Sequence, residues 1–362
     1  MSTEYSEHLT GVVAEILHRT PQETSLSDLR HWHSRLPDYV DRQLRQAHVT
    51  AVFAELGHFH RAMHRRVFEL ATQRLLSEGW PDYGDACLFL MLGSGARDEQ
   101  SIKTDQDHAL ILIPPDRQCG SDELAAYGRA LGELTAAMLS EVGYPLCAGN
   151  VMASNPRWRG TVTEWNMRLD AYGEHPDWDN IRYLLIASDA MPIAGKSTVA
   201  DQIRAIAVAH VTRSSFIRWK IADQVSADRL TLPFTAHFAD LAAARKAAFS
   251  LKDGLYTPLV NIVRLWAHSI GSEQPSTLTR IGELEASDVW NSRVSDEARE
   301  ALAIALELRL RQHIWQSQTG KELNDELPLA EVREPDRERL QSAVKTVREL
   351  QHMSSRRFTR RR

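Results

Sequence analysis

Short apolar runs are confined to the middle of the chain. Three stand out, at residues 87–92 (CLFLML), 108–113 (HALILI) and 182–188 (RYLLIAS). A largely apolar run of roughly four to eight residues is typical of a strand that is buried on both faces. The pattern therefore predicts three buried strands, the second of them ended by Pro114 and Pro115.

Helical patterns dominate before and between these runs. Residues 58–79 (HFHRAMHRRVFELATQRLLSEG) alternate basic and apolar faces and stop at Gly79, with Pro81 beyond it. A glycine followed by a proline is typical of a helix end. The first 80 residues are therefore predicted to be helical. The segments 121–141 and 161–172 are also predicted to be helices.

Few glycines interrupt the C-terminal part. Only four of the 18 glycines lie beyond residue 200, which predicts few turns of the kind that connect strands. Residues 201–225 and 236–250 are rich in alanine with a helical period, and an apolar residue recurs every four positions from 302 to 314. Gly320 stands where a helix C-cap is expected. This part is therefore predicted to be mostly helical.

The bulk composition narrows the class of protein. A length of 362 residues favours two domains. A net charge of −5 argues against a broad nucleic-acid-binding surface, which normally comes with a basic domain. Three cysteines without a CxxC pair (Cys87, Cys119 and Cys147) favour free thiols in a reducing compartment. With no signal-peptide pattern and no membrane-spanning apolar run, we expect a cytoplasmic protein with no membrane partner.

Two aspartates, Asp105 and Asp107, stand at the start of the second apolar run. Residues two apart on a strand point to the same face, so the two carboxylates are expected side by side. Adjacent carboxylates repel each other unless a cation lies between them. Mg²⁺ typically takes one or two carboxylates together with phosphate oxygens of a substrate. The pair therefore predicts a Mg²⁺–nucleotide site, which Mn²⁺ would also fit.

A Gly-Ser-Gly turn precedes the aspartates. Gly93 and Ser94 let the backbone approach a ligand and turn its N–H groups toward phosphates, with the Ser94 hydroxyl as a further donor. A helix opening in ARDEQSI (96–102) would add its dipole to anion binding. Arg97 and Lys103 are expected within reach of a triphosphate. We therefore predict nucleotide binding by Gly93, Ser94, Arg97 and Lys103.

A two-metal transfer normally needs a third carboxylate from elsewhere in the chain. Asp189 is the best candidate, because it ends the third apolar run and a neighbouring strand would bring it alongside the pair. Asp170 and Asp179 are weaker candidates in helical or loop segments. An Asp-x-Asp or a Gly-Ser turn alone is more often structural. Their combination with Asp189, in the order strand, turn, helix, strand, favours a functional site.

Two other motifs are interpreted as structural. AGKST (194–198) lacks the earlier glycine that a phosphate-binding P-loop needs, so a helix start after Gly195 is favoured. His58, His60 and His64 include an i, i+4 pair that would suit Zn²⁺, but they lack further ligands at suitable spacing. A solvated helix face is the preferred interpretation of these histidines.

Two stretches each allow two interpretations. NPRWRG (155–160) is either a loop that stacks a base or an acceptor on Trp158 and its arginines, or a packed turn with Trp158 in the core. The arginine-rich tail, residues 356–362, is either a solvated end or a segment that binds anions or a partner.

The stretch GSGARDEQSIKTDQDHALI (93–111) resembles the signature of the DUF294 family. That family is related to the N-terminal part of protein-PII uridylyltransferase, within the DNA polymerase β-like nucleotidyltransferase superfamily. Residues 149–165 and 188–204 resemble two further blocks of the family. Residues 250–284 are similar to its C-terminal substrate-binding domain. The resemblance covers roughly residues 55–355.

The resemblance implies an α+β fold, with a small mixed-sheet nucleotidyltransferase core flanked by helices and a C-terminal helical bundle. The implied domains are an N-terminal helical extension (1–50), a nucleotidyltransferase domain (51–200), a helical substrate-binding domain (201–355) and a basic tail (356–362).

The resemblance also carries metal binding onto Asp105 and Asp107, and nucleotide binding onto Gly93 and Ser94. Asp189 matches the third acidic position. The chain departs from the family pattern at His108, where an asparagine is usual. It also departs around Asp189, which lacks the usual aromatic residue before it and the usual arginine after it.

These observations predict Mg²⁺-dependent transfer of a nucleoside monophosphate from ATP or UTP to an acceptor hydroxyl, with release of pyrophosphate. Asp105, Asp107 and Asp189 would be the catalytic and metal-binding residues. The acceptor would be a small molecule or a protein such as a PII-type regulator, a step that rests on family analogy alone. The alternative is a non-catalytic, nucleotide-binding regulator that keeps the turn and the acidic pair.

Overall fold

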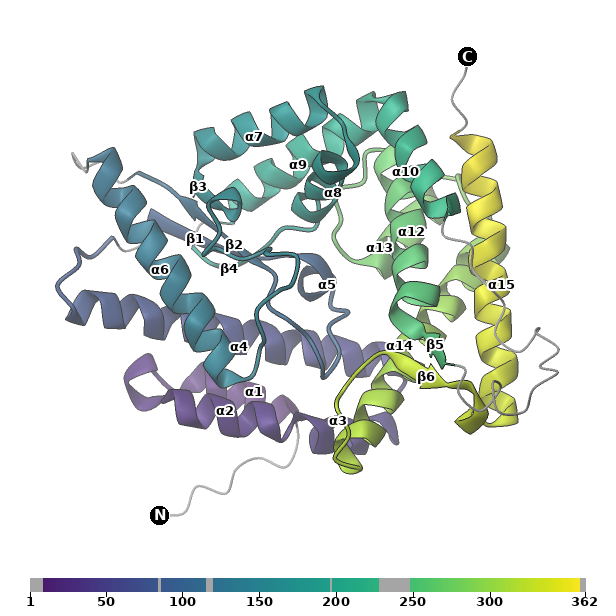
Figure 1. The fold of residues 1–362 in the computed structure, drawn as a ribbon, viewed down its shortest axis with the longest axis horizontal. Helices are drawn as coiled ribbons and strands as arrows, with labels where there is room; N and C mark the ends of the chain where they lie inside the picture. Colours follow the sequence, from purple (N-terminus) through teal and green to yellow (C-terminus); the bar gives the residue numbers. More distant parts are fainter. Residues whose placement is uncertain (1–8, 84–85, 115–119, 196, 228–247, 359–362) are drawn as a thin grey trace. The chain divides into compact units, whose positions relative to one another are not determined.

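The computed structural model describes residues 9–83, 86–114, 120–195, 197–227 and 248–358. The chain divides into two compact units. One is Met1–His175 with Arg182–Ala207, and the other is Pro176–Ile181 with Val208–Arg362. Helices dominate both units, and a four-stranded sheet belongs to the first, which confirms the α+β class (Figure 1). In the described ranges, every helix is too short or too polar to cross a membrane.

Four short strands form the sheet of the first unit, in the order β3-β2-β1-β4. They are β1 (Cys87–Met91), β2 (His108–Leu112), β3 (Arg159–Thr161) and β4 (Met191–Ala194). β2 and β4 pair antiparallel to β1, whereas β3 pairs parallel to β2, so the sheet is mixed. Every residue of β1 and β2 is buried, which confirms that these two runs are strands covered on both faces.

Two long helices, α4 (Val49–Ser77) and α6 (Ser121–Val142), cover one face of this sheet (Figure 1). Phe89 of β1 and Leu112 of β2 share that face in the antiparallel register. Phe68 of α4 stacks on Phe89, with ring centroids 4.6 Å apart, and α6 packs against Leu112. The helices predicted in these two segments are confirmed.

Three short helices precede α4 in the chain. They are α1 (Leu9–His18), α2 (Leu26–Ser34) and α3 (Leu36–Leu44), with a 3₁₀ turn η1 at Pro21–Glu23. α1 and α3 pack on α4 and α2 packs on α6, through buried side chains of which Trp32 is the largest. The predicted helical character of the first 80 residues is therefore confirmed over their described part.

Helix α7 (Val162–Glu174) follows β3 directly and contacts both β2 and β3 (Figure 1). Its start is a capping box: Thr161 Oγ1 accepts from the N–H of Glu164, and the Glu164 carboxylate accepts from the N–H of Thr161. The helix predicted at 161–172 is confirmed, and a 3₁₀ turn η3 (Pro156–Trp158) precedes β3.

The third apolar run is not a strand. Residues 182–188 belong mostly to helix α8 (Trp178–Ala187), and the fourth strand of the sheet is β4, which begins two residues after Asp189. Buried side chains in α8 recur at Ile181, Leu184 and Leu185, which is helical spacing. The prediction was wrong because a short apolar run fits a buried strand and a buried helix equally well.

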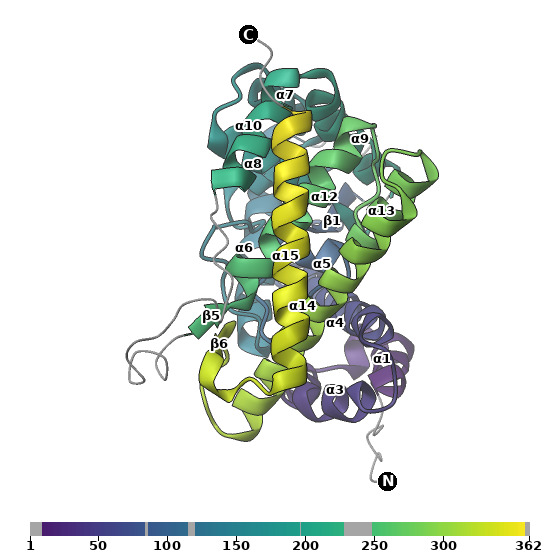
Figure 2. The same ribbon diagram turned by 90° about the vertical axis from the view of Figure 1, so that its right-hand side faces the viewer.

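The second unit is a helical bundle. Its helices are α10 (Ser215–Ala227), α12 (Thr257–Ser269), α13 (Thr277–Ala286), α14 (Ser292–Gln318) and α15 (Glu334–Arg357). α12 contacts α10, α13 and α15, and most of its residues are buried. α14 and α15 lie side by side along their length (Figure 2). Inside the bundle, the indole of Trp266 donates a hydrogen bond to Ser354 Oγ at 2.8 Å.

A two-stranded ribbon joins β5 (Ala248–Ser250) to β6 (Glu326–Pro328) in this unit. A π-helical turn η4 (Lys252–Tyr256) follows β5, and a 3₁₀ turn η5 (Leu329–Glu331) follows β6. The helix predicted at 236–250 is wrong for its last three residues, which form β5; its residues 236–247 lie outside the described part of the chain.

The other helix predictions for the C-terminal part hold with one break. The segment 201–225 contains α9 (Thr198–Arg213) and α10, which are separated at Ser214. Gly320 follows α14 in a left-handed conformation, with φ +67°. Its N–H donates to Ser317 O and the next N–H donates to Gln316 O, which is the Schellman pattern. The glycine therefore ends the helix as predicted.

Candidate metal and nucleotide site

The motif Asp105-Gln106-Asp107-His108 alternates between two environments. Both aspartates are partly exposed, whereas Gln106 and His108 are fully buried. β2 begins at His108, so the aspartates precede the strand rather than lie on it, although the Asp107 carbonyl still accepts from Leu92 N–H at 2.9 Å. The alternation leaves the two carboxylates on the accessible side of the segment.

Gln106 holds a second segment, which begins at Tyr144, next to the aspartates through hydrogen bonds. Its side-chain amide donates to Tyr144 O at 3.0 Å and to Ala136 O at 3.1 Å. Its backbone N–H donates to Pro145 O at 3.1 Å. One buried glutamine therefore fixes where the segment after α6 crosses the Asp-x-Asp.

His108 attaches the same segment further on. Its backbone N–H donates to Val151 O at 3.0 Å, and its ring Nδ1 accepts from Ala153 N–H at 3.1 Å. The ring Nε2 then donates to Gln106 Oε1 at 2.8 Å. Burial lowers the pKa of His108 to about 3, so the ring is neutral. The histidine that departs from the family pattern thus has a structural role.

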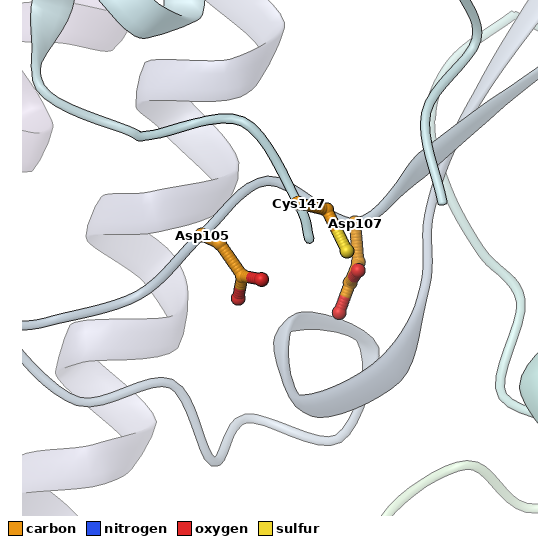
Figure 3. Close-up of side chains that lie close together, drawn as sticks. All are labelled: Asp105, Asp107 and Cys147. Atoms are coloured by element: carbon orange, nitrogen blue, oxygen red, sulfur yellow. The ribbon is translucent and has the colours of Figure 1, made fainter. Parts of the chain in front are cut away.

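These attachments bring Cys147 beside the two acids. Its Sγ and one carboxylate oxygen each of Asp105 and Asp107 lie within 4.8 Å of one another, and the three side chains converge in Figure 3. All three are partly exposed. Burial, followed by the nearby Asp107 carboxylate, raises the pKa of the thiol to about 12. This contact could not be predicted from spacing, because Cys147 lies 40 positions after Asp107.

The Gly-Ser turn lies against this cluster. Gly93 has φ +56°, and a Cβ there would come within 2.7 Å of Asp107 Oδ2. Glycine is therefore required both by the left-handed conformation and by the close approach. A single helical turn, α5 (Gly93–Ala96), starts at this glycine, and Ser94 within it is partly exposed. The condition that ARDEQSI opens as a helix is not met, since the helical turn ends at Ala96.

Arg97 and Asp189 form a buried ion pair. Arg97 Nη1 donates to Asp189 Oδ2 at 2.6 Å, and Arg97 Nε donates to Glu99 Oε2 at 2.7 Å. Arg97 is 7% exposed and Asp189 is 0% exposed. In the described ranges, the group of side chains that could hold a metal ion contains Asp105, Asp107 and Cys147 but not Asp189. Of the two cations predicted to face a triphosphate, Arg97 is buried in this pair and Lys103 is exposed.

The donor set at Asp105 and Asp107 fits a divalent cation. Carboxylate oxygens are the ligands that Mg²⁺ and Mn²⁺ prefer, and a thiol is a softer ligand. The site is partly exposed, and the lack of a side chain at Gly93 lets Asp107 Oδ2 lie close to the backbone of the turn. The arrangement can therefore hold a cation next to the backbone of the Gly-Ser turn.

Comparison with protein families gives two matches. Residues 34–179 match the family described as putative nucleotidyltransferase DUF294, and residues 218–358 match the family described as putative nucleotidyltransferase substrate binding domain. The chain belongs to the DUF294 family. The DUF294 match includes Asp105, Asp107 and Cys147, whereas Asp189 lies beyond its end. A search of curated proteins gives no match.

Two histidines of the DUF294 core are buried, which corrects the solvated helix face predicted for them. His60 Nδ1 lies 2.9 Å from Tyr144 Oη, and His64 Nδ1 donates to His60 O at 2.8 Å. Burial lowers the pKa of His64 to about 4 and that of His60 well below its usual value. The prediction failed because the N-terminal helices and the sheet both pack on α4. His58 alone is exposed.

Two remaining motifs of this DUF294 chain, NPRWRG and AGKST, fit their structural interpretations. Trp158 is buried, 2% exposed, and its ring lies 6.0 Å from that of Trp165, which supports the packed-turn interpretation of NPRWRG. In AGKST, helix α9 starts at Thr198 after Gly195, which supports a helix start over a P-loop. The tail begins inside α15, and its residues 359–362 lie outside the described part of the chain.

Proposed function

We propose that this DUF294 protein transfers a nucleoside monophosphate from ATP or UTP to an acceptor hydroxyl and releases pyrophosphate. The observation that carries the proposal is the convergence of Asp105 and Asp107 beside the Gly93 turn. Family membership supports nucleotidyl transfer in general. The choice of base, the acceptor and the ion belong to the proposal.

Asp105 and Asp107 would hold the divalent cation, with Mg²⁺ as the expected ion and Mn²⁺ as a substitute. The chemistry supplied by a bound cation is neutralisation of phosphate charge and activation of the acceptor hydroxyl. The N–H groups and hydroxyl of Gly93 and Ser94 would bind the β- and γ-phosphates. A bond forms between the acceptor oxygen and the α-phosphorus, and the bond from that phosphorus to the departing pyrophosphate breaks.

Arg97 and Asp189 enter the proposal as a linked pair. Arg97 follows the Gly-Ser turn directly, and its ion pair ties that turn to the segment after α8. We assign the pair a positioning role for the phosphate-binding turn. A metal-binding role for Asp189, and phosphate contacts by Arg97 or Lys103, remain predictions that substitutions can test.

The acceptor would be a protein or a small molecule selected by the helical domain at 218–358, which matches a substrate-binding family. A regulatory protein of the PII type is the acceptor that the family relationship suggests.

The second candidate function is a nucleotide-binding regulator that transfers nothing. One observation favours it. In the described residues, the group that could hold a metal ion has two carboxylates, and Asp189, the predicted third carboxylate, is paired with Arg97. A two-metal transfer site normally uses more than two carboxylates.

A transfer assay tests both functions. The purified full chain is incubated with α-labelled ATP or UTP, Mg²⁺ and a cell lysate as the source of acceptor, and both incorporated label and pyrophosphate are measured. For a transferase, Asp107→Asn should reduce the rate at least about a hundredfold. Asp122→Asn, which changes an exposed carboxylate on α6, is the matched control and should leave the rate unchanged. Mg²⁺-dependent nucleotide binding without incorporated label would favour the regulator.

A further inference from the structure

Cys147 differs from the other described cysteine in where it lies. Cys87 is buried within β1, whereas Cys147 is partly exposed. Its thiol shares a space within 4.8 Å with carboxylate oxygens of Asp105 and Asp107 (Figure 3). The proposed function uses the two carboxylates and leaves the sulfur without a role.

We propose that Cys147 completes, with Asp105 and Asp107, a three-ligand site for a thiophilic divalent cation of the Zn²⁺ class. The inference rests on the proposed function only in placing this ion at the carboxylates assigned to the catalytic cation. Zn²⁺ is bound by carboxylate oxygens at about 2.0–2.2 Å and by a thiolate at about 2.3 Å. Donor atoms that already lie within 4.8 Å of one another are near the separation that one such ion spans.

The sulfur determines which ions the site prefers. Carboxylates alone suit hard cations such as Mg²⁺, whereas a thiolate adds affinity for softer ions. Three protein ligands also leave a fourth position of a tetrahedral ion open for water or a phosphate oxygen. A thiophilic ion would therefore compete with Mg²⁺ for the same two carboxylates, and nucleotide binding would depend on which ion is bound.

Hydrogen bonds hold the backbone on both sides of Cys147 in place. The Cys147 carbonyl accepts from Asn150 N–H at 2.9 Å, and the segment is anchored on either side by Gln106 and His108. Asn150 has φ +56°, so the chain turns sharply just after the cysteine. A ligand fixed in this way loses little conformational freedom when it binds an ion.

Cadmium provides the test, because a cadmium–thiolate bond gives a charge-transfer absorption that a cadmium–carboxylate bond lacks. The variant with Cys87→Ala and Cys119→Ser retains Cys147 as the only thiol of the chain. Reduced, nucleotide-free full-length protein is titrated with Cd²⁺. We expect one equivalent of thiolate absorption in this variant and its loss when Cys147→Ser is added. Asp107→Asn should weaken Cd²⁺ binding at least about tenfold.

Two outcomes would overturn the inference. One is the absence of thiolate absorption in the variant that keeps only Cys147, provided that its melting temperature and circular dichroism match the wild type. The other is Cd²⁺ affinity that is unchanged by Asp105→Asn and Asp107→Asn, which would make the thiol a ligand on its own.

The label-transfer assay separates this inference from the proposed function. Cadmium binding that needs Asp107 and Cys147, in a protein that transfers no label, supports the metal site and contradicts the transferase. Label transfer by a protein that shows no cadmium–thiolate absorption supports the transferase and contradicts the role of Cys147.

Discussion

Two groups of acidic side chains in the first unit differ in how they are surrounded. Asp189 and Glu99 are buried around the guanidinium of Arg97, which donates to both. Asp105 and Asp107 are partly exposed and lie beside a thiol and a glycine. The first group satisfies its charge inside the protein, and the second presents its charge to solvent. Only the second group has the access that a substrate-bound cation requires.

The largest expected effect is on stability and comes from the buried group. Arg97→Met should lower the free energy of unfolding by about 3–5 kcal/mol, because it leaves two buried carboxylates without their cation. Asp107→Asn should change it by less than about 0.5 kcal/mol, since its side chain is partly exposed. Urea unfolding of both variants measures the contrast. Equal stability of the two would remove the distinction between the groups.

Asp189→Asn sharpens the same comparison. It leaves Arg97 paired with Glu99, so its cost should be smaller than that of Arg97→Met. In a positioning role, Asp189→Asn leaves the affinity for Mn²⁺ within about twofold of the wild type, against a loss of at least about tenfold for Asp107→Asn. Calorimetric titration with Mn²⁺ decides the point, and a loss equal to that of Asp107→Asn would make Asp189 a metal ligand.

Acid is expected to destabilise the fold through buried histidines near Asp105 and Asp107. His64 and His108 are buried and neutral, with pKa values of about 4 and about 3, against about 6.5 when unfolded. The unfolded chain therefore binds protons first, and stability falls as the pH drops from about 6.5 toward 4. The expected slope is about 1.4 kcal/mol per pH unit for each histidine.

Urea midpoints between pH 7 and pH 5 measure this slope. His64→Phe should make it shallower, whereas His58→Gln, which changes an exposed residue of the same helix, should leave it unchanged. A wild-type stability that is flat over this range would show that the buried histidines do not limit it.

The smallest expected effect is at the turn. Gly93→Ala adds a Cβ that meets Asp107 Oδ2 and costs about 1–2 kcal/mol in a left-handed conformation. Gly79→Ala is the matched control, since Gly79 has φ +93° with no atom within 4 Å of an added Cβ. Both variants should lose similar stability, but only Gly93→Ala should weaken Mn²⁺ binding. An equal effect of both variants on Mn²⁺ affinity would show that the turn is independent of the proposed metal site.

Local patterns predicted those elements that depend on residues near in sequence. The apolar runs at 87–92 and 108–113 form β1 and β2, and Gly320 ends α14 through a Schellman pattern. The run at 182–188 failed, because its length does not distinguish a buried strand from a buried helix. His60 and His64 failed for another reason: their burial depends on helices that pack on α4 from elsewhere in the chain.

The residues of the candidate site also divide into those that local sequence predicts and those that it does not. Asp105, Asp107 and Gly93 are close in sequence and could be singled out from spacing and residue type. Cys147 could not, because its place beside Asp107 follows from hydrogen bonds that Gln106 and His108 make with a distant segment. The partner of Asp189 was equally hidden, since Arg97 lies 92 positions earlier.

The alternation of Asp105 and Asp107 with Gln106 and His108 gives the short motif two separate tasks. The two aspartates are accessible to solvent. Gln106 and His108 hold the segment from Tyr144 to Ala153 by hydrogen bonds at its two ends. One residue inserted between Pro145 and Val151 would shift the thiol relative to both acids while the sheet kept its pairing. Loop length alone would then change the ion preference of the proposed site, without any change to the acids themselves.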